Sequence, residues 1–466
     1  MYPIISGSYA MRGTIQEPHL VNCREFSVTP LEDQALAAII MDCDGQTSVR
    51  ELASRYEISI DDLLAFLNKF ESAGMIDFSP QQIRRRPFVA LGQQSPWLRE
   101  VHIDITNRCN LARWCRHCFR GDKLNRSQDV QTADWLRVIE DLSAMGSYSV
   151  AFSGGEPTLR RDLPQLVECV LKHKMFFGAL FTNGFVWSKN MDAILSMLAE
   201  SGSKTTLYVS LDGPTAKLHD ANRGPGAYQK TVAFIKRLVA FRERCDAKYR
   251  LTVNSQVTAE NMHTLLSWYD DLKKLDIDRW RITSGRVTGR LAENTGLLPS
   301  WDELFVEYEK LICQHIADYR SGPTMLLNME SFFNTSMLNN GYALTFSPVI
   351  SICDYKEQAC SIEPNGDVQF CTSWGSRNFG NVFSTGIRDI WHSDSLQTLK
   401  QMKVGQITEC QNCDLLQFCG GGCRLVPGDV TKKDPTSCER YRRFVDIILP
   451  LLQAAGISFY NERSLP

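Results

Sequence analysis

Cysteine is the residue type most able to support chemistry in this chain, and its sixteen copies include two dense groups among 466 residues. The first group consists of Cys109, Cys115 and Cys118, and the second consists of eight cysteines between residues 353 and 438. In a chain of this length such groups favour metal binding over a disulfide framework. Thiolates are the usual ligands of iron–sulfur clusters and frequent ligands of zinc.

The three cysteines of the first group are compatible with two kinds of metal centre. Zinc would require a fourth ligand, which His102 or His117 could supply. A four-iron cubane held by three cysteines would leave one iron open, and an open iron can bind and activate a small molecule. The cysteines alone leave both possibilities open.

Short glycine-rich or polar motifs end the strands that we expect after these cysteines, among them Gly154-Gly155-Glu156 and Asn183-Gly184. The carboxyl ends of the strands in an α/β barrel meet at the end where such proteins do chemistry, so we expect the motifs to surround the cysteines. The glycines would let a ligand approach the backbone, Glu156 offers a carboxylate to an ammonium group, and the later polar groups suit a ribose. The candidate ligand-binding residues are Gly154, Gly155, Glu156, Asn183, Ser210, Asp212 and Arg223.

The elements that must position these residues alternate between strands and amphipathic helices. Alternation of this kind predicts parallel strands with crossover helices, and therefore an α/β fold with a partial (β/α)6 barrel. The expected strands cover residues 101–105, 148–152, 176–182, 207–211, 250–257 and 280–283.

The residues before the barrel predict a small winged-helix-like domain. A helix over 29–42, a second helix opened by Ser48, a third over 60–72 and a closing strand over 74–78 follow one another. Winged helices often bind DNA, but the mixed charges here provide no basic recognition helix, so we expect no nucleic-acid partner. The formal net charge is −2, there is no run of 18 apolar residues and no signal-peptide pattern, so we expect a cytoplasmic protein without a membrane partner.

The second group of cysteines has a dense and specific spacing, Cys410-x2-Cys413-x5-Cys419-x3-Cys423. A zinc ribbon would explain the first pair, whereas eight cysteines equal the ligand count of two four-iron cubanes. The region 346–445 has few long apolar stretches, so we expect it to depend on metal rather than on a core of its own. The remaining cysteines of the group are Cys353, Cys360, Cys371 and Cys438.

Taken together, residues 98–290 resemble the radical S-adenosylmethionine (SAM) superfamily. The resemblance implies a [4Fe–4S] cluster on the first three cysteines, whose open iron chelates the methionine end of SAM. It implies that Gly154 to Glu156 meet the methionine amine, that Ser210 faces the ribose side and that Arg223 pairs with the methionine carboxylate. The chain departs from the usual spacing, because five residues rather than three separate Cys109 from Cys115. His117 occupies a position that is often aromatic.

Residues 346–445 resemble the SPASM extension of radical enzymes that modify peptides and proteins. The resemblance implies two auxiliary [4Fe–4S] clusters. Cys360 is either a fourth ligand of the first cluster or a packing residue of the hairpin predicted at Asn365-Gly366. The implied ligands are Cys353, Cys371 and Cys423 for the first auxiliary cluster, and Cys410, Cys413, Cys419 and Cys438 for the second.

These resemblances imply a radical SAM enzyme that cleaves SAM reductively to a 5′-deoxyadenosyl radical. The radical would abstract hydrogen from a ribosomally made precursor peptide, leading to a thioether or carbon–carbon cross-link or to a backbone modification. The N-terminal domain resembles leader-peptide recognition domains, and flavodoxin or ferredoxin would supply the low-potential electron. We therefore expect a recognition domain over 1–92, a barrel over 93–325, a SPASM domain over 326–450 and a C-terminal tail over 451–466.

Three alternatives remain open from the sequence. A quinone-cofactor peptide enzyme would share this architecture. A sulfatase-maturing enzyme would usually carry Asp just after the hairpin cysteine, where this chain has Thr372. A non-catalytic iron–sulfur regulator with a winged helix would leave the strand-end motifs without a purpose.

Overall fold

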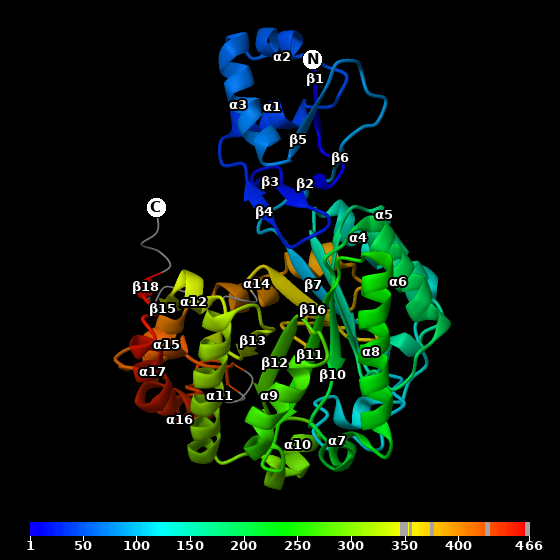
Figure 1. Ribbon diagram of the computed structural model, residues 1–466. Coiled ribbons are helices and arrows are strands. Elements are labelled where there is room, and N and C mark those ends of the chain that lie inside the picture. The colour runs from blue at the N-terminus through cyan, green and yellow to red at the C-terminus, as the bar shows by residue number, and fades with distance from the viewer. Residues whose placement is uncertain (345–352, 354–356, 373–376, 425–428, 462–466) are drawn as a thin grey trace.

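The computed structural model describes residues 1–344, 353, 357–372, 377–424 and 429–461 (Figure 1). The strands are β1 (Tyr2–Ile5), β2 (Tyr9–Gly13), β3 (Pro18–Asn22), β4 (Val28–Pro30), β5 (Ile76–Ser79), β6 (Phe88–Val89), β7 (Glu100–Asp104), β8 (Ser149–Ser153), β9 (Phe176–Thr182), β10 (Thr206–Ser210), β11 (Arg250–Val257), β12 (Arg279–Ser284), β13 (Leu326–Met329), β14 (Phe333–Asn334), β15 (Tyr342–Leu344), β16 (Ala359–Ile362), β17 (Val368–Gln369) and β18 (Phe459–Asn461).

The α-helices lie mainly between the barrel strands and in the C-terminal region. They are α1 (Gln34–Met41), α2 (Val49–Arg55), α3 (Ile60–Ser72), α4 (Thr132–Ala144), α5 (Leu163–Lys172), α6 (Lys189–Ser201), α7 (Ala216–Arg223), α8 (Ala227–Cys245), α9 (Leu265–Lys273), α10 (Arg290–Glu293), α11 (Trp301–Ser321), α12 (Met337–Asn340), α13 (Ile387–Trp391), α14 (Asp394–Gln401), α15 (Leu416–Cys419), α16 (Pro435–Arg443) and α17 (Leu449–Ala454).

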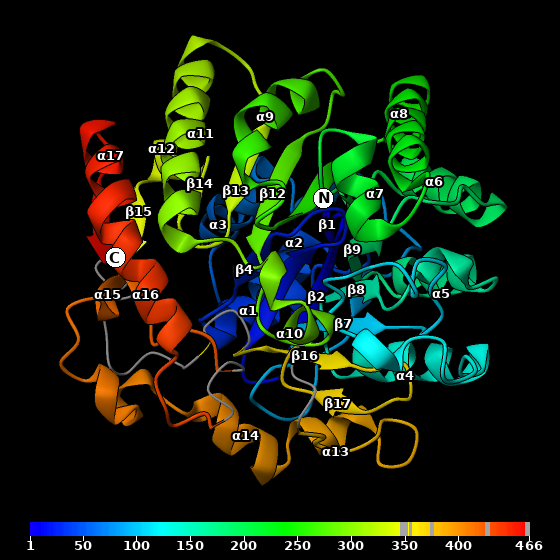
Figure 2. The ribbon, with the colours of Figure 1, turned by 90° about the horizontal axis from the view of Figure 1, so that it is seen from below.

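The central sheet confirms the predicted barrel strands to within one residue at each end. Strands β7 to β12 are neighbours in sequence order, and all five pairings between them are parallel. Seen from below, α4, α5, α6 and α8 cover one side of these strands, while the C-terminal helices lie on other sides (Figure 2). Crossover helices of this kind leave the carboxyl ends of the strands free to carry loops.

The C-terminal region extends the same sheet, which the sequence did not predict. Strand β16 pairs in parallel with β7, β13 pairs in parallel with β12, and the sheet reaches ten strands. Trp391, Leu396 and Phe444 belong to the same buried cluster as the barrel core. We expected this region to depend on metal because it has few apolar stretches of its own. Its scattered apolar residues instead pack into the core of the barrel, so burial also stabilises it.

The N-terminal domain has the three predicted helices around a separate core. Ser48 and Glu51 form a reciprocal capping box that begins α2, and Ser59 caps α3. The first helix begins later than predicted, because the Asp33 side chain accepts hydrogen bonds from the amides of Ala35 and Leu36. Residues 28–30 instead form β4, which extends the sheet β4-β3-β2-β6.

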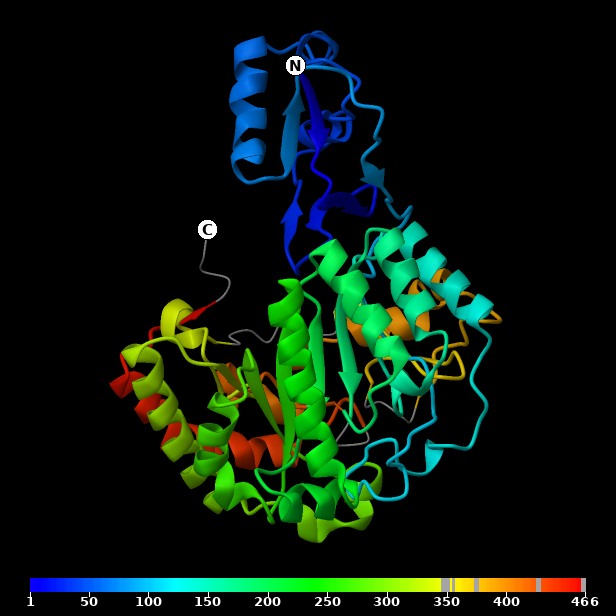
Figure 3. The same cartoon turned by 45° about the vertical axis from the view of Figure 1, so that its right-hand side comes forward.

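This domain contacts the end of the barrel at which the strands begin (Figures 1 and 3). Arg12 donates to the carbonyl oxygen of Ser143 in the last turn of α4, which precedes β8 (3.0 Å). The Tyr148 hydroxyl donates to the carbonyl oxygen of Glu25 (2.5 Å). The strands run away from the domain, so their carboxyl ends, near α7 and α10, lie at the opposite end of the barrel.

The segment predicted as a C-terminal tail is folded through residue 461. It continues α17 and then forms β18, which pairs in parallel with β15. Residues 462–466 lie outside the described residues. Among the helices that the structure describes, none combines the length and the apolar character needed to cross a bilayer.

Candidate active site

The first three cysteines lie together in the loop that follows β7. Burial raises the pKa of the Cys109 thiol to about 12, with smaller contributions that include the Cys118 thiol. A hydrogen bond from the Cys118 thiol lowers the pKa of Cys115. The three thiols therefore lie close enough to influence one another, as the ligands of one cluster must.

An ion pair and an amide fix this loop. Arg120 and Asp104, both buried, form an ion pair at the end of β7, and Arg120 also donates to the side chain of Asn107 (2.8 Å). The Asn125 side chain accepts from the amide of Cys109 (2.8 Å) and donates to its carbonyl oxygen (3.0 Å). These contacts set the backbone of the first ligand before any metal binds.

The longer gap between the first two cysteines is accommodated by packing on α7 and α10. A side chain at Gly224 would lie 2.6 Å from the ring of Trp114, so this glycine leaves room for the tryptophan. Arg290 donates to the carbonyl oxygens of Ala112 and Cys115. The five intervening residues thus form a supported bulge between the two cysteines.

The two glycines after β8 allow two protein loops to approach each other. A Cβ atom on Gly154 would lie 2.4 Å from the carbonyl oxygen of Thr106, and one on Gly155 would lie 2.4 Å from that of Arg108. The amide of Gly155 donates to Thr106 (2.8 Å), and the amide of Glu156 donates to Arg108 (2.8 Å). The glycines therefore bring this loop against the segment that leads into Cys109.

The Glu156 carboxylate is committed to protein donors. It accepts from the amide and hydroxyl of Thr158, from the hydroxyl of Thr182 (2.8 Å) and from the amide of Asn183 (2.7 Å). Burial raises the pKa of this carboxyl group. The Glu156 side chain therefore caps neighbouring strand ends, a role that the sequence did not predict.

Asn183 and Ser210 occupy the ends of the next two strands. The Asn183 amide nitrogen lies 4.0 Å from Cys109 Sγ and donates to the side chain of Asn110 (2.8 Å). Ser210 is the last residue of β10, is partly exposed and lies in register with Asn254 of β11. Asn183 therefore lies beside the first cysteine, and Ser210 lies at a strand end.

Asp212 is the centre of a buried network that ties the cysteine loop to β10. It is fully buried and accepts hydrogen bonds from Arg223, from Nε2 of His117 (2.8 Å) and from the amide of Gln256 (2.9 Å). Burial alone would raise the pKa of Asp212, but Arg223 and His117 hold it well below its usual range. Arg223 is thereby paired with a protein carboxylate, and Asp212 has no oxygen turned to solvent.

His117 is the functional position whose role the sequence did not reveal. Its Nδ1 lies 3.7 Å from Cys115 Sγ while its Nε2 binds Asp212. The short spacing from Cys115 could have indicated proximity, but the partner lies 95 residues away. Because Nε2 is engaged, His117 positions the cysteine loop instead of completing a zinc site through that atom.

Four cysteines of the second group also lie together. Burial raises the pKa of the Cys410, Cys419 and Cys438 thiols. Neighbouring thiols of the same set, which also includes Cys413, raise each of these pKa values further. Gly420, Gly421 and Gly422 all have positive φ (58°, 84° and 74°), which is why three glycines separate Cys419 from Cys423. The structure thus brings together the ligand set expected for the second auxiliary cluster.

Of the other four cysteines of this group, three belong to the barrel core or pack against it. Cys360 is fully buried in β16, opposite Val101 of β7, and belongs to the core cluster. Cys353 and Cys371 pack against that cluster, and Cys423 donates its amide to Asp434 (3.0 Å). No two cysteines in the described part of the chain form a disulfide.

Comparison with known proteins identifies the family. The pattern of the Radical SAM superfamily matches residues 103–269, and that of an iron–sulfur cluster-binding domain, SPASM, matches residues 353–414. The mycofactocin maturase MftC of Mycobacterium ulcerans (strain Agy99) is 30% identical over 329 residues, which cover 69% of this chain and 81% of that protein. The chain belongs to the radical SAM superfamily.

Two further similarities widen the comparison for this radical SAM enzyme. The AdoMet-dependent heme synthase of Nitratidesulfovibrio vulgaris (strain Hildenborough) is 24% identical over 366 residues, covering 75% of this chain and 94% of that protein. The crystal structure of Streptococcus suis SuiB bound to precursor peptide SuiA matches with a TM-score of 0.67 and 18% identity, covering 94% of this chain and all of that chain. The matched part of this chain is longer than the barrel and the C-terminal region together. The shared fold therefore also includes residues of the N-terminal domain.

Membership of this superfamily implies a [4Fe–4S] cluster with SAM, and the SPASM domain implies auxiliary iron–sulfur clusters. The residues fit these groups. Among the described residues, three thiols influence one another at the carboxyl end of β7, and four thiols influence one another near α16. Thiolates are the ligands that such clusters prefer.

Proposed function

We propose that this enzyme modifies a ribosomally made precursor peptide by abstracting hydrogen from an unactivated carbon. The observation that carries the proposal is the fold shared with SuiB over the barrel, the SPASM region and the N-terminal domain together. The similarity to a mycofactocin maturase supports the same substrate class. The product is a thioether or carbon–carbon cross-link or a modified backbone.

Bound cluster and SAM supply a 5′-deoxyadenosyl radical, and the chain's own residues prepare the place where it forms. Cys109, Cys115 and Cys118 would hold the cluster at the carboxyl ends of the strands. The backbone of residues 154–156 and the polar groups of Asn183 and Ser210 line the space for SAM. The site must exclude water so that the radical reacts with substrate alone.

We assign recognition of the leader part of the peptide to the N-terminal domain. Strands β4 and β6 are the edges of its four-stranded sheet, and an extended peptide can add to such an edge through backbone hydrogen bonds. Its mixed charge supports a peptide rather than a nucleic acid as the partner.

The position of this domain sets a minimum length for the substrate. The domain contacts the amino ends of the strands, whereas the cysteine triplet lies at their carboxyl ends. The longest barrel strand has eight residues, or about 26 Å at 3.3 Å per residue. At 3.3–3.6 Å per extended residue, at least about eight residues must separate the bound leader from the modified residue.

We assign the electron supply to flavodoxin or ferredoxin and the location to the cytoplasm. Reductive cleavage of SAM needs a low-potential donor, and the auxiliary clusters can accept or conduct an electron. A reducing compartment would preserve the sixteen cysteines as thiols and ligands.

A second candidate substrate is a tetrapyrrole. The similarity to an AdoMet-dependent heme synthase covers nearly all of that protein, so the barrel and cluster regions are compatible with either substrate class. The N-terminal domain favours the peptide.

The test is to reconstitute the enzyme anaerobically and incubate it with SAM, dithionite and each short peptide encoded beside its gene. We expect one peptide to change mass while 5′-deoxyadenosine accumulates. The Cys109→Ala variant should bind the leader part of that peptide with unchanged affinity by fluorescence anisotropy, yet leave its mass unchanged. Unchanged peptides together with product formation stimulated by a tetrapyrrole would favour the second candidate.

A further inference from the structure

Arg424 is a buried cation that directly follows Cys423 in the second group of cysteines. Its side chain is 3% exposed, and its Nη1 donates to the carbonyl oxygens of Lys432 (2.7 Å) and Val430 (3.2 Å). Its Nε and Nη2 have no hydrogen-bond acceptor in the part of the chain that the structure describes. A buried charge without a counter-charge is strongly unfavourable, so these two groups need an anionic partner.

The nearby carboxylates are already engaged. Asp434, which is 2% exposed, accepts from the amide of Cys423 (3.0 Å) and from the amide and hydroxyl of Ser437 (3.2 and 2.5 Å). Asp429 is exposed and binds the amide and hydroxyl of Thr431. Neither is hydrogen-bonded to Arg424.

The thiols of the second auxiliary set are a source of negative charge close to this segment. Arg424 binds the carbonyl oxygens of Val430 and Lys432, and this segment leads directly into Asp434, whose carbonyl oxygen accepts from the amide of Cys438 (3.1 Å), so the guanidinium and one thiol of the second set are held by the same short segment. When four thiolates hold a [4Fe–4S]²⁺ core, the whole group carries two negative charges. The buried guanidinium of Arg424 would then lie in the same small region as this anionic cluster, and each charge would compensate the other.

We propose that Arg424 donates its Nε and Nη2 hydrogens to the auxiliary cluster held by Cys410, Cys413, Cys419 and Cys438, and that its charge raises the reduction potential of that cluster. Reduction adds one negative charge, which a buried cation stabilises, and hydrogen bonds to cluster sulfur act in the same direction. Arg424 is then a positioning and tuning residue. The inference rests on the proposed ligand set, but not on the identity of the substrate.

The test is an EPR-monitored redox titration of protein carrying Cys109→Ala, Cys115→Ala and Cys118→Ala, so that auxiliary clusters alone contribute. Cys413→Ala added to this protein identifies the signal of the second cluster; if no signal changes, the ligand set itself is wrong. We expect Arg424→Gln to make the midpoint potential of this cluster more negative by at least about 59 mV. For a one-electron couple this shift is a tenfold change in the equilibrium constant. The exposed Arg442→Gln, near Cys438, is the matched control and should shift it far less.

Arg424→Lys separates charge from loop structure. The lysine keeps the charge, so its potential should stay closer to the unsubstituted value than that of Arg424→Gln. If Arg424→Gln loses iron, Arg424→Lys should restore it. An unchanged potential in iron-replete Arg424→Gln, or a lysine variant as impaired as the glutamine variant, would overturn the proposal.

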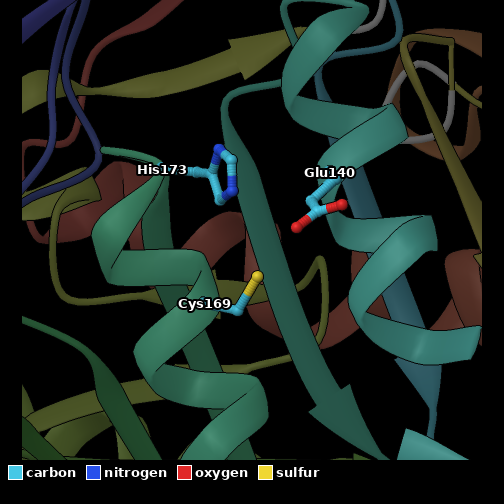
Figure 4. Close-up of side chains that lie close together, drawn as sticks. All are labelled: Glu140, Cys169 and His173. Carbon is cyan, nitrogen blue, oxygen red and sulfur yellow. The ribbon is translucent and has the colours of Figure 1, made fainter. Parts of the chain in front are cut away.

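A separate observation lies on the outer helices of the barrel. Glu140 of α4, Cys169 of α5 and His173, which caps α5, place one ligand atom each within 4.8 Å of one another (Figure 4). Cys169 is buried, His173 is partly exposed, and Glu140 is exposed. Among the described residues, this is the one group of three such side chains whose ligand atoms all lie within 4.8 Å of one another.

The geometry of this group suits a borderline divalent metal. Cys169 and His173 are four residues apart, so they project from one face of α5 toward α4. One sulfur, one nitrogen and one carboxylate oxygen are all zinc ligands, and three of them leave a fourth position for water. The site adjoins the N-terminal domain, because Arg12 donates to the carbonyl oxygen of His173.

We infer that Glu140, Cys169 and His173 form a zinc site that links α4 to α5 beneath the N-terminal domain. On binding, the Cys169 thiol loses its proton to solvent and the thiolate coordinates the metal. The exposed Glu140 provides the entry side.

The test uses the cluster-loaded protein with Zn²⁺ as the probe, followed by gel filtration and metal analysis. We expect one zinc per chain, lost in Cys169→Ser and His173→Ala, and retained in the control Glu168→Gln, which alters an exposed neighbour. With Co²⁺ as the probe, a thiolate-to-cobalt absorption band should appear and be absent in Cys169→Ser. Glu140→Gln, on the exposed side, should weaken zinc binding at least tenfold. Equal zinc content in unsubstituted protein and Cys169→Ser would overturn the site.

Discussion

The two convergent cysteine sites of this protein are held in different ways. The first lies at the mouth of the barrel, where strand ends and ion pairs position three thiols among polar groups that have room for a ligand. The second lies near α16, where glycine turns and a capped helix bring together four thiols. An open set of three beside polar strand ends suits SAM binding, whereas a closed set of four suits electron transfer.

The largest contrast should come from removing one thiol at each site. Cys115→Ala should reduce 5′-deoxyadenosine formation to background, because the first cluster is the one that meets SAM. Cys419→Ala should retain measurable SAM cleavage while product formation on the peptide falls sharply. Chromatography of 5′-deoxyadenosine beside mass spectrometry of the peptide measures both, and identical profiles for the two variants would remove the distinction.

The Asp212 network tests whether the first site depends on buried charge. Asp212→Ala leaves Arg223 buried without its partner and should lower the free energy of unfolding by about 3–5 kcal/mol. Denaturant unfolding under anaerobic conditions measures this loss. A change under about 1 kcal/mol would show that the network is not a support of the site.

The pH dependence of this contribution has a definite sign. The pKa of Asp212 in the folded protein lies below its unfolded value of about 3.9. Its stabilising contribution is therefore fully present above about pH 4 and is lost as the pH falls toward the folded value. The Asp212 carboxylate stays ionised from pH 5 to 8. Over this range the free energy of unfolding should therefore depend on pH in the same way in the unsubstituted protein and in Asp212→Ala.

The glycine after β8 tests how closely the first site is packed. Gly155→Ala would place a methyl group 2.4 Å from the carbonyl oxygen of Arg108, and the backbone must shift, at a cost of about 1–3 kcal/mol. SAM affinity, measured by equilibrium dialysis, should fall with it. Gly296→Ala is the matched control, because among the described residues no heavy atom beyond its two chain neighbours lies within 4 Å of the added methyl group. Equal SAM affinity in the two variants would contradict the close approach.

The smallest effect should come from the ion pair that links the two regions. Lys123 follows the first cysteines and lies 3.0 Å from Glu363 of the SPASM hairpin, but its side chain is 47% exposed. Such a pair contributes about 0–1 kcal/mol. Lys123→Met should therefore change neither the unfolding midpoint nor 5′-deoxyadenosine formation appreciably, and a loss as large as that of Asp212→Ala would show that the two regions act as one unit.

Sequence reasoning located the barrel well, because buried parallel strands are short apolar runs that crossover helices separate. It missed the pairing of β16 with β7, which joins segments about 260 residues apart and has no local signal. It also placed Thr29 at the start of a helix, although Asp33 is the residue that caps it. Short strands such as β4 depend on their partners more than on their own residues.

Sequence reasoning named the residues of the candidate site more accurately than their contacts. The spacing of the cysteines and the strand-end motifs predicted which residues converge. It did not predict that Glu156 and Arg223 bind protein partners, because the choice among possible partners depends on tertiary geometry. His117 shows the same limit, since its partner Asp212 lies on another strand end.

The most direct test of the central claim is the yield of 5′-deoxyadenosine from the anaerobically reconstituted protein with SAM and dithionite. The protein with all its cysteines should form this product, and the variant carrying Cys109→Ala, Cys115→Ala and Cys118→Ala should form none while retaining its auxiliary iron. No product from the iron-replete unsubstituted protein, or equal product from the two proteins, would contradict the assignment of the first site.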